Sequence, residues 1–145
     1  MLNLGLTHPP LIGALAAAGH GSQILLADGN YPHSTGANPS ATRIYLNLAP
    51  GVLGVDDVLK VLVDVVPIES ATVMVPGDGT EPVAVTGYRK TLGAALTVHE
   101  LGRHEFYAAA RTQDVAVVIA TGDLRHYANL LLTIGVRPDA SVAIS

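Results

Sequence analysis

Short apolar runs that alternate with helical segments constrain the fold of this 145-residue chain more than any other feature. The run VAVVIA at 115–120 is entirely apolar, and ATVMV at 71–75 is rich in β-branched residues. Runs of this length are typical of strands buried on both faces, as in parallel sheets covered by helices. The pattern therefore predicts an α/β protein with a largely parallel sheet.

Prolines, glycines and hydrophobic spacing divide the rest of the chain. Helices are predicted at 8–18, 54–66, 83–96 and 103–112. Strands are predicted at 23–28, 43–48, 71–75, 97–101, 115–120 and 127–134. These elements predict one domain over residues 1–145, a three-layer α/β/α fold with about six strands. The segment 29–42 is rich in turn residues and is predicted to be a long loop, a kind of segment that is often functional.

The composition limits the function. Hydrophobic residues make up 49% of the chain and charged residues 14%, which suggests surface buried against other subunits. The net charge of −4 comes with no basic cluster, so nucleic acid is not an expected partner. No apolar run reaches the ~18 residues of a membrane span, and no secretory signal is recognisable. The absence of cysteine excludes disulfides and thiolate chemistry, and we expect a cytoplasmic protein.

The stretch GHGSQILLAD at 19–28 is the first candidate for a site. His20 lies between two glycines that would let a ligand approach closely, and an apolar run leads to Asp28. In open α/β sheets, ligands bind beyond the carboxyl ends of strands. One interpretation is an acid/base histidine and a carboxylate in one pocket. The other is a helix-capping glycine, a surface histidine and a strand-ending aspartate.

Two further pairs could bind a ligand. Arg103 and Tyr107 are four residues apart on a predicted helix and share a face, while Phe106 can face the core. Tyr127 and Asn129 would point to the same side of a predicted strand. The first pair could donate to a hydroxyl-rich ligand or be only a solvated pair, and a pair like the second is more often structural.

Other kinds of chemistry lack local support. The six histidines form no metal-binding helical pair, and His104 and His126 are expected on solvated faces. The glycines at 77–79 lack the lysine and spacing of a phosphate loop, and no serine nucleophile motif is present. We expect neither a metal nor a cofactor, although a metal-dependent hydrolase using the scattered histidines remains an alternative.

Fragments along nearly the whole chain resemble the family of ribose pyranases and fucose mutarotases, RbsD/FucU. In chain order, the matching segments are GHG at 19–21, AD at 27–28 with NYP at 30–32, VM at 73–74, RxxFY at 103–107, ATG at 120–122 and YANL at 127–130. Arg103 before the Phe-Tyr pair is similar to the fucose branch, whereas the ribose branch tends to carry a histidine nearby. Ser22, Gly29 and Tyr31 depart from the common pattern of the fucose branch.

The resemblance implies roles for particular residues. His20 would be the proton donor and Tyr107 a second catalytic group. Glu69 falls where animal members of the fucose branch carry a catalytic aspartate, so it is the third catalytic candidate. The implied sugar contacts come from the ends of several predicted elements: Asp28, Met74, Arg103, Tyr127 and Asn129.

The implied function is that of a mutarotase interconverting anomers or ring forms of a free monosaccharide, with L-fucose or a relative as the favoured substrate. The alternatives are a D-ribose pyranase and a non-catalytic sugar-binding subunit associated with sugar transport. The resemblance also implies a ring-like homo-oligomer, with a decamer as the candidate size.

Chain length adds a constraint on the site. Eight residues separate His20 from Asp28, and an extended chain of that length spans about 26 Å. This is far more than one monosaccharide. Either the chain bends sharply at Gly21, or the two residues reach a common sugar only across an interface between neighbouring chains.

Overall fold

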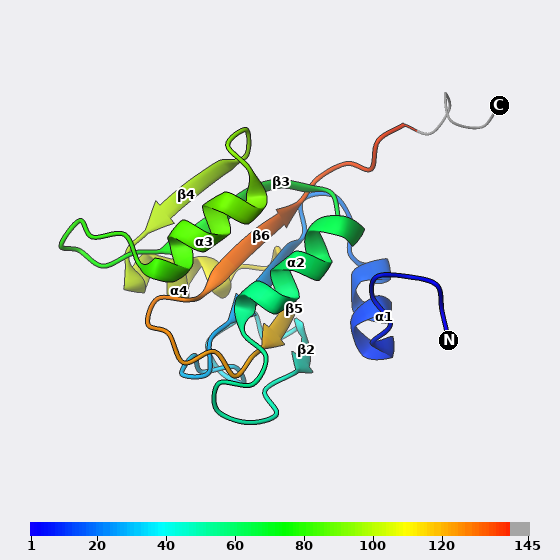
Figure 1. Ribbon diagram of the computed structural model, residues 1–145, viewed down its shortest axis with the longest axis horizontal. Helices are drawn as coiled ribbons and strands as arrows, with labels where there is room; N and C mark the ends of the chain where they lie inside the picture. Colours follow the sequence, from blue (N-terminus) through cyan, green and yellow to red (C-terminus); the bar gives the residue numbers. More distant parts are fainter. Residues whose placement is uncertain (140–145) are drawn as a thin grey trace.

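The structure, a computed structural model, describes residues 1–139 and has a six-stranded sheet at its centre (Figure 1). The helices are α1 (Pro9–Ala17), α2 (Val55–Val65), α3 (Val83–Leu92) and α4 (Arg103–Ala110). The strands are β1 (Gln23–Ala27), β2 (Thr42–Tyr45), β3 (Ile68–Met74), β4 (Thr97–Leu101), β5 (Val115–Ala120) and β6 (Leu130–Ile134). The prediction of an α/β protein with six strands is confirmed.

The sheet is mixed, so the prediction of a largely parallel sheet is only partly right. Its order is β2-β5-β1-β6-β3-β4, and β6 runs antiparallel to both of its neighbours. The other pairings are parallel. The chain between β5 and β6, residues 121–129, contains no helix, and it is too short for the crossover of a dozen or more residues that parallel strands need. The chain therefore reverses direction at the end of the sheet where β5 finishes, and β6 runs antiparallel to its neighbours.

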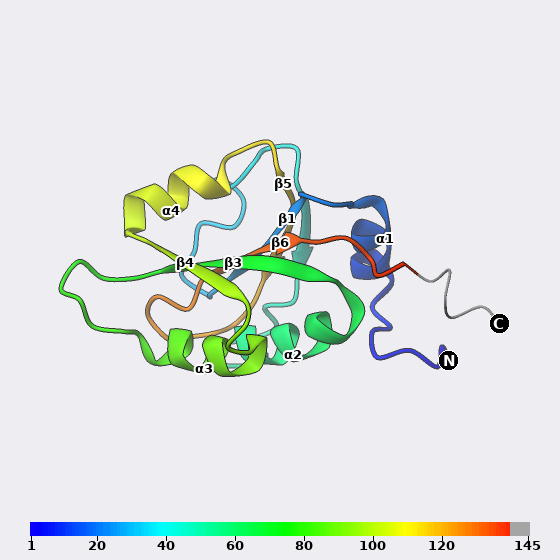
Figure 2. The same cartoon turned by 90° about the horizontal axis from the view of Figure 1, so that it is seen from above.

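Helices cover both faces of the sheet. Figure 2 shows α2 and α3 on one side, α4 on the other, and α1 at one end. Side chains from α2 and α3, such as Leu59 and Tyr88, pack in one apolar cluster with alternate residues of the strands. Phe106 and Ala110 of α4 pack in a second cluster on the opposite face, as their helical spacing predicts.

Several boundaries differ from the predicted ones for local reasons. Helix α3 ends at Leu92 because Gly93 has a φ of 90°, which ends helical geometry. Strand β3 begins at Ile68, earlier than predicted, because it pairs with the end of β6. Strand β2 ends at Tyr45 instead of residue 48. Tyr127 lies before β6 with a φ of 57°, so the predicted strand over 127–129 is wrong.

The loop between β1 and β2 is held by Arg43 of β2. The guanidinium group donates hydrogen bonds of 3.0 Å to the His33 carbonyl and 2.8 Å to the Asn38 carbonyl. It also donates to the Ala41 carbonyl at 3.1 Å. Because one side chain satisfies carbonyls along the loop, the segment that follows β1 keeps a defined path.

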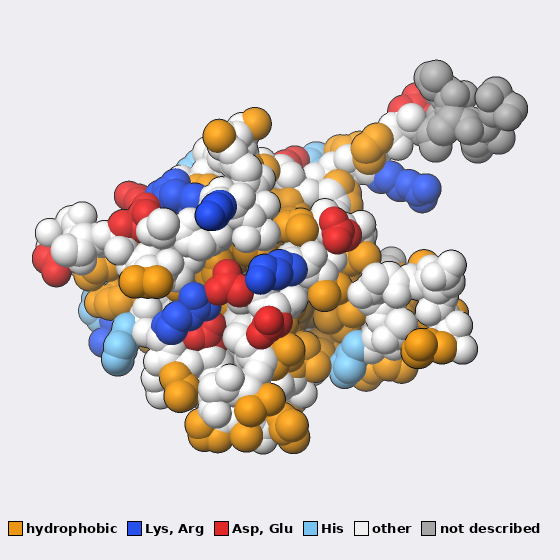
Figure 3. Space-filling view, in the orientation of Figure 1, with side chains coloured by type: hydrophobic (Ala, Val, Ile, Leu, Met, Phe, Trp, Pro, Cys, Tyr) orange, Lys and Arg blue, Asp and Glu red, His pale blue; other side chains and the backbone are white. Residues whose placement is uncertain are grey.

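Hydrophobic side chains reach the surface beside the charged ones (Figure 3). Leu48, Val52 and Leu124 are exposed at the loops beyond β2 and β5, and Leu2 and Leu4 near the N-terminus. The longest helix, α2, has 11 residues, and within residues 1–139 no helix is both long and apolar enough to span a bilayer.

Candidate active site

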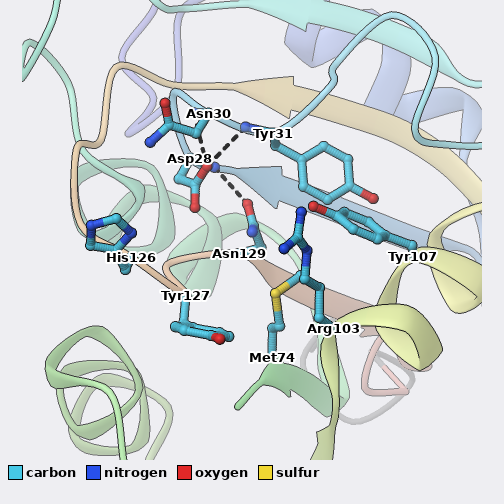
Figure 4. Close-up of a pocket in the computed structure, with 9 residues that line it drawn as sticks. All are labelled: Asp28, Asn30, Tyr31, Met74, Arg103, Tyr107, His126, Tyr127 and Asn129. Atoms are coloured by element: carbon cyan, nitrogen blue, oxygen red, sulfur yellow. Dashed lines mark hydrogen bonds between the residues drawn. The ribbon is translucent and has the colours of Figure 1, made fainter. Parts of the chain in front are cut away.

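A cleft of about 330 Å³ opens at one end of the sheet, where strands β1, β3 and β4 finish and β6 begins (Figure 4). Nine residues line it: Asp28, Asn30, Tyr31, Met74, Arg103, Tyr107, His126, Tyr127 and Asn129. Six of the eight residues implied by the resemblance are among them. The remaining two, His20 and Glu69, lie elsewhere.

Asp28 and Asn129 form the polar floor of the cleft. Asp28 follows β1, and its Oδ1 accepts hydrogen bonds from the N–H groups of Asn30 and Tyr31 at 3.0 and 2.9 Å. The Asp28 N–H donates to Oδ1 of Asn129 at 2.8 Å. A carboxylate has acceptor sites beyond these bonds, and the amide nitrogen of Asn129 is a donor, so both groups can bind a ligand.

The Asp28 carboxyl is buried, with 5% of the residue exposed. Burial raises its pKa above the ordinary value, and this outweighs the opposing effect of the N–H groups of Asn30, Tyr31 and Ala128. A ligand hydroxyl that donates to the carboxylate would replace part of the hydration that burial removes. The site is therefore suited to a hydroxyl donor at this position.

Aromatic rings form the opposite wall. Tyr31 and Tyr107 have ring centroids 5.3 Å apart, and the Tyr31 hydroxyl donates to the Gly36 carbonyl at 2.6 Å. Its hydroxyl is thus occupied, and burial raises its pKa, so Tyr31 contributes mainly a ring surface. The Arg103 guanidinium lies 5.7 Å from the Tyr107 ring centroid, which confirms that these two residues share a helix face.

The cleft thus combines converging hydrogen-bonding groups with apolar surface. Met74 ends β3, and Figure 4 shows it beside Tyr127, across the cleft from Asp28. A ligand with several hydroxyl groups and an apolar face would satisfy both parts.

His20 and Glu69 form a pair at the other end of the sheet. His20 precedes β1 and Glu69 belongs to the start of β3, whereas Asp28 and Met74 follow and end these strands. The His20 Nε2 lies 3.1 Å from Oε2 of Glu69. Although Gly21 has a φ of 85°, this bend does not bring His20 into the cleft; His20 lines a separate hollow with Val65 and Val136.

Three residues of the cleft were not among the predicted site residues: Asn30, Tyr31 and His126. His126 was expected on a solvated face; it is exposed, but it also lines the cleft. Asn30 could have been found from its position two residues after Asp28, where a carboxylate commonly binds a backbone N–H. No local pattern marks His126.

A charge cluster fixes the segment 121–129 that carries Tyr127 and Asn129. Arg125 donates to both carboxylate oxygens of Asp123, at 2.9 and 2.6 Å, and also contacts Asp56 at 2.8 Å. Asp123 Oδ2 accepts the Val55 N–H at the start of α2 at 3.0 Å. Burial alone raises the pKa of Asp123, but the bonds from Arg125 and Val55 outweigh it and hold the pKa below its ordinary value.

We expect Asp123→Asn to lower the free energy of unfolding by about 2 kcal/mol at neutral pH, because a nearly buried, charge-assisted set of hydrogen bonds is lost. Since the folded pKa is depressed, the contribution of Asp123 is present above its unfolded pKa and is lost as pH falls through the folded pKa. Denaturant unfolding of both proteins from pH 7 to pH 2 measures this. The exposed Asp78→Asn is the control; an equal loss there, or a difference independent of pH, would contradict the prediction.

Comparison with known proteins extends the resemblance. The sequence matches the profile of the RbsD / FucU transport protein family over residues 1–137. The chain belongs to this family. It is 32% identical over 136 residues to a D-ribose pyranase of Paracidovorax citrulli, covering 94% of this chain and 98% of that protein. It is 34% identical over 141 residues to the fucose mutarotase of Bos taurus, covering 90% of each.

Solved structures of RbsD/FucU proteins have the same fold. Bacillus subtilis RbsD complexed with D-ribose matches with a TM-score of 0.82 at 25% identity, over 94% of this chain and 99% of that one. A Streptococcus pneumoniae fucose mutarotase in complex with L-fucose matches with a TM-score of 0.80 at 26% identity, over the same shares. The similar identities to pyranase and mutarotase place the chain in the family without choosing between its branches.

Proposed function

We propose that this RbsD/FucU protein is a monosaccharide mutarotase that uses general acid/base catalysis, with L-fucose or a related sugar as substrate and D-ribose as the alternative. One observation carries the proposal. Residues from four separate parts of the chain, each implied by the resemblance to contact the sugar or to act in catalysis, line a single cleft: Asp28, Met74, Arg103, Tyr107, Tyr127 and Asn129.

The reaction needs two proton transfers and no oxidant. A base takes the proton of the anomeric hydroxyl while an acid protonates the ring oxygen, and the bond from the anomeric carbon to the ring oxygen breaks. Rotation about the next carbon–carbon bond and reclosure on the other carbonyl face give the other anomer. General acid/base groups contribute about 10²–10⁴-fold to such steps.

The side chains of the cleft can hold the sugar during these steps. Asp28 and Asn129 offer an acceptor and a donor to ring hydroxyls, and Arg103 can donate to two oxygens at once. Within residues 1–139 no partner engages the Tyr107 hydroxyl, so we assign it as the second catalytic group, a donor to the ring oxygen. Met74 would pack against an apolar face or methyl group.

We further propose that a neighbouring copy of the chain supplies His20 and Glu69. Within one chain these residues lie at the end of the sheet opposite the cleft. Their side chains are 59% and 46% exposed, so they are accessible to another protomer. Val65 and Val136 line the same hollow and are also exposed, which provides apolar surface for the contact. A ring-like homo-oligomer would repeat this contact around the assembly.

The pairing with Glu69 gives His20 a defined role. When Nε2 carries the proton and donates to the Glu69 carboxylate, Nδ1 is the free nitrogen that can exchange a proton with the sugar. Because the pair is exposed in one chain, its attraction stabilises the fold little there. Its value lies in orienting the imidazole.

Saturation-transfer NMR on free sugars tests the proposed function. The purified protein, at catalytic concentration, should accelerate exchange between the two anomers of L-fucose or of another sugar in a panel that includes D-ribose. Sugar binding without accelerated exchange would instead support the non-catalytic sugar-binding subunit. If the protein neither binds any sugar of the panel nor accelerates its exchange, the assignment of the cleft is wrong.

A further inference from the structure

We infer that His126 is a sugar-contact residue that helps determine which monosaccharide the cleft accepts. This rests on the proposed sugar site, and it adds a residue that the resemblance did not mark. His126 is the one histidine of residues 1–139 that lines the cleft (Figure 4). In that view its ring lies on the same side of the cleft as Asn30 and Asp28, away from the Tyr31 and Tyr107 rings.

The residues on both sides fix the position of His126, even though its own side chain is exposed. On one side, Arg125 is bound to Asp123 through the backbone N–H and the guanidinium group. On the other side, Tyr127 has the left-handed φ of 57°, and the Ala128 carbonyl accepts the buried Tyr88 hydroxyl at 2.6 Å. Because the backbone on both sides of His126 is already fixed, holding the imidazole at the cleft costs little backbone entropy.

His126 also stands where the cleft meets a second hollow. Together with Tyr127 and Arg125 it lines a neighbouring hollow of about 570 Å³, whose other wall is the segment 76–84. His126 and Tyr127 therefore separate the two spaces. A sugar substituent that extends from the cleft toward the second hollow has to pass these two side chains.

The chemistry of an imidazole suits this place. It can donate or accept a hydrogen bond according to its tautomer, and its ring can pack against a methyl or methylene group. The Asp28 N–H already orients the Asn129 side chain, and the N–H groups of Asn30 and Tyr31 orient the Asp28 carboxylate. Asp28 and Asn129 bind hydroxyls inside the cleft. His126 lies at the rim of the cleft, where it contacts the ring substituent that differs between monosaccharides of the same ring configuration.

The test uses sugars that vary in one group only. D-arabinose, L-fucose and L-galactose share a ring configuration in the pyranose form and carry hydrogen, methyl and hydroxymethyl at the same ring carbon. Anomer exchange rates are measured for these three and for D-ribose with the wild type, His126→Asn, His126→Phe and the control His99→Asn. His99 is exposed on β4 and lies outside the cleft.

We expect at least one His126 variant to change the ratio of kcat/KM between two of the sugars by about fivefold, the effect of one net hydrogen bond or packing contact. The His99 variant should keep the wild-type ratios. In parallel, sugar added to the wild type should shift the ring proton resonances of His126, identified by their absence in His126→Asn.

The inference would be overturned if both His126 variants kept the wild-type ratios of kcat/KM and sugar left the His126 resonances unshifted. An active wild type would still support the proposed mutarotase function. A wild type that binds and converts no sugar would instead overturn the proposed function and this inference with it. Because His126 is exposed, neither variant is expected to lower the melting temperature.

Discussion

Replacing His20 by asparagine is expected to slow anomer exchange of the cognate sugar by about 10²-fold, the lower end of what a general acid/base group contributes. Asparagine keeps a hydrogen-bonding side chain but cannot take up and release a proton at neutral pH. The loss should appear in kcat, because His20 is proposed to transfer a proton, whereas residues of the cleft hold the sugar. Exchange NMR over a range of sugar concentrations separates kcat from KM.

Two controls make this result specific. The His20 side chain is 59% exposed, so the variant should unfold at the same temperature as the wild type. Glu69→Gln retains the hydrogen bond to His20 but removes the charge, and a smaller loss of rate is expected from it. An unchanged exchange rate in His20→Asn would show that His20 is not the proton donor.

Asp28→Asn is expected to weaken sugar binding by about 10–100-fold, because hydrogen bonds to a charged group contribute about 1.5–3 kcal/mol. The amide can still accept the N–H groups of Asn30 and Tyr31 through its oxygen. The substitution replaces the second carboxylate oxygen, an acceptor, with an NH2 group, which is a donor. Titration calorimetry with the cognate sugar measures the loss.

Stability should change in a different way from affinity. Burial raises the folded-state pKa of Asp28, so the folded protein holds this proton more tightly than the unfolded chain does. Its contribution to the free energy of unfolding therefore falls as pH rises through the raised pKa, and asparagine removes that dependence. Asp28→Asn should bind sugar poorly at neutral pH without unfolding more easily. A parallel loss of binding and stability would mean that Asp28 acts through the fold.

Much of the fold could be predicted because its signals are local. The strands at 97–101 and 115–120 have the predicted bounds, since each is a short run of strand-forming residues between turn or helix signals. Arg103 and Tyr107 share a face because helical spacing alone determines it. The length of chain between His20 and Asp28 likewise narrowed the site to two arrangements, a sharp bend at Gly21 or a site shared between chains.

The features that were missed depend on tertiary contacts. The direction of β6 follows from the return path of 121–129, which hydrophobic periodicity does not encode. Tyr127 and Asn129 were expected on one side of a strand, yet Tyr127 is in a left-handed turn and only the segment after it pairs. His126 reaches the cleft because Asp56, which is distant in the sequence, holds Arg125 together with Asp123. No pattern within a short window contains that information.

The most direct test of the proposed shared site is subunit complementation. Alone, the His20→Asn and Asp28→Asn variants are each expected to have little or no exchange activity. Equal amounts of the two variants are then mixed and refolded together. If one chain supplies His20 and its neighbour supplies Asp28, random assembly gives about a quarter of the sites both intact residues. We predict that the mixture regains about that fraction of the wild-type exchange rate. A mixture no more active than the average of the two variants would contradict a site shared between neighbouring chains.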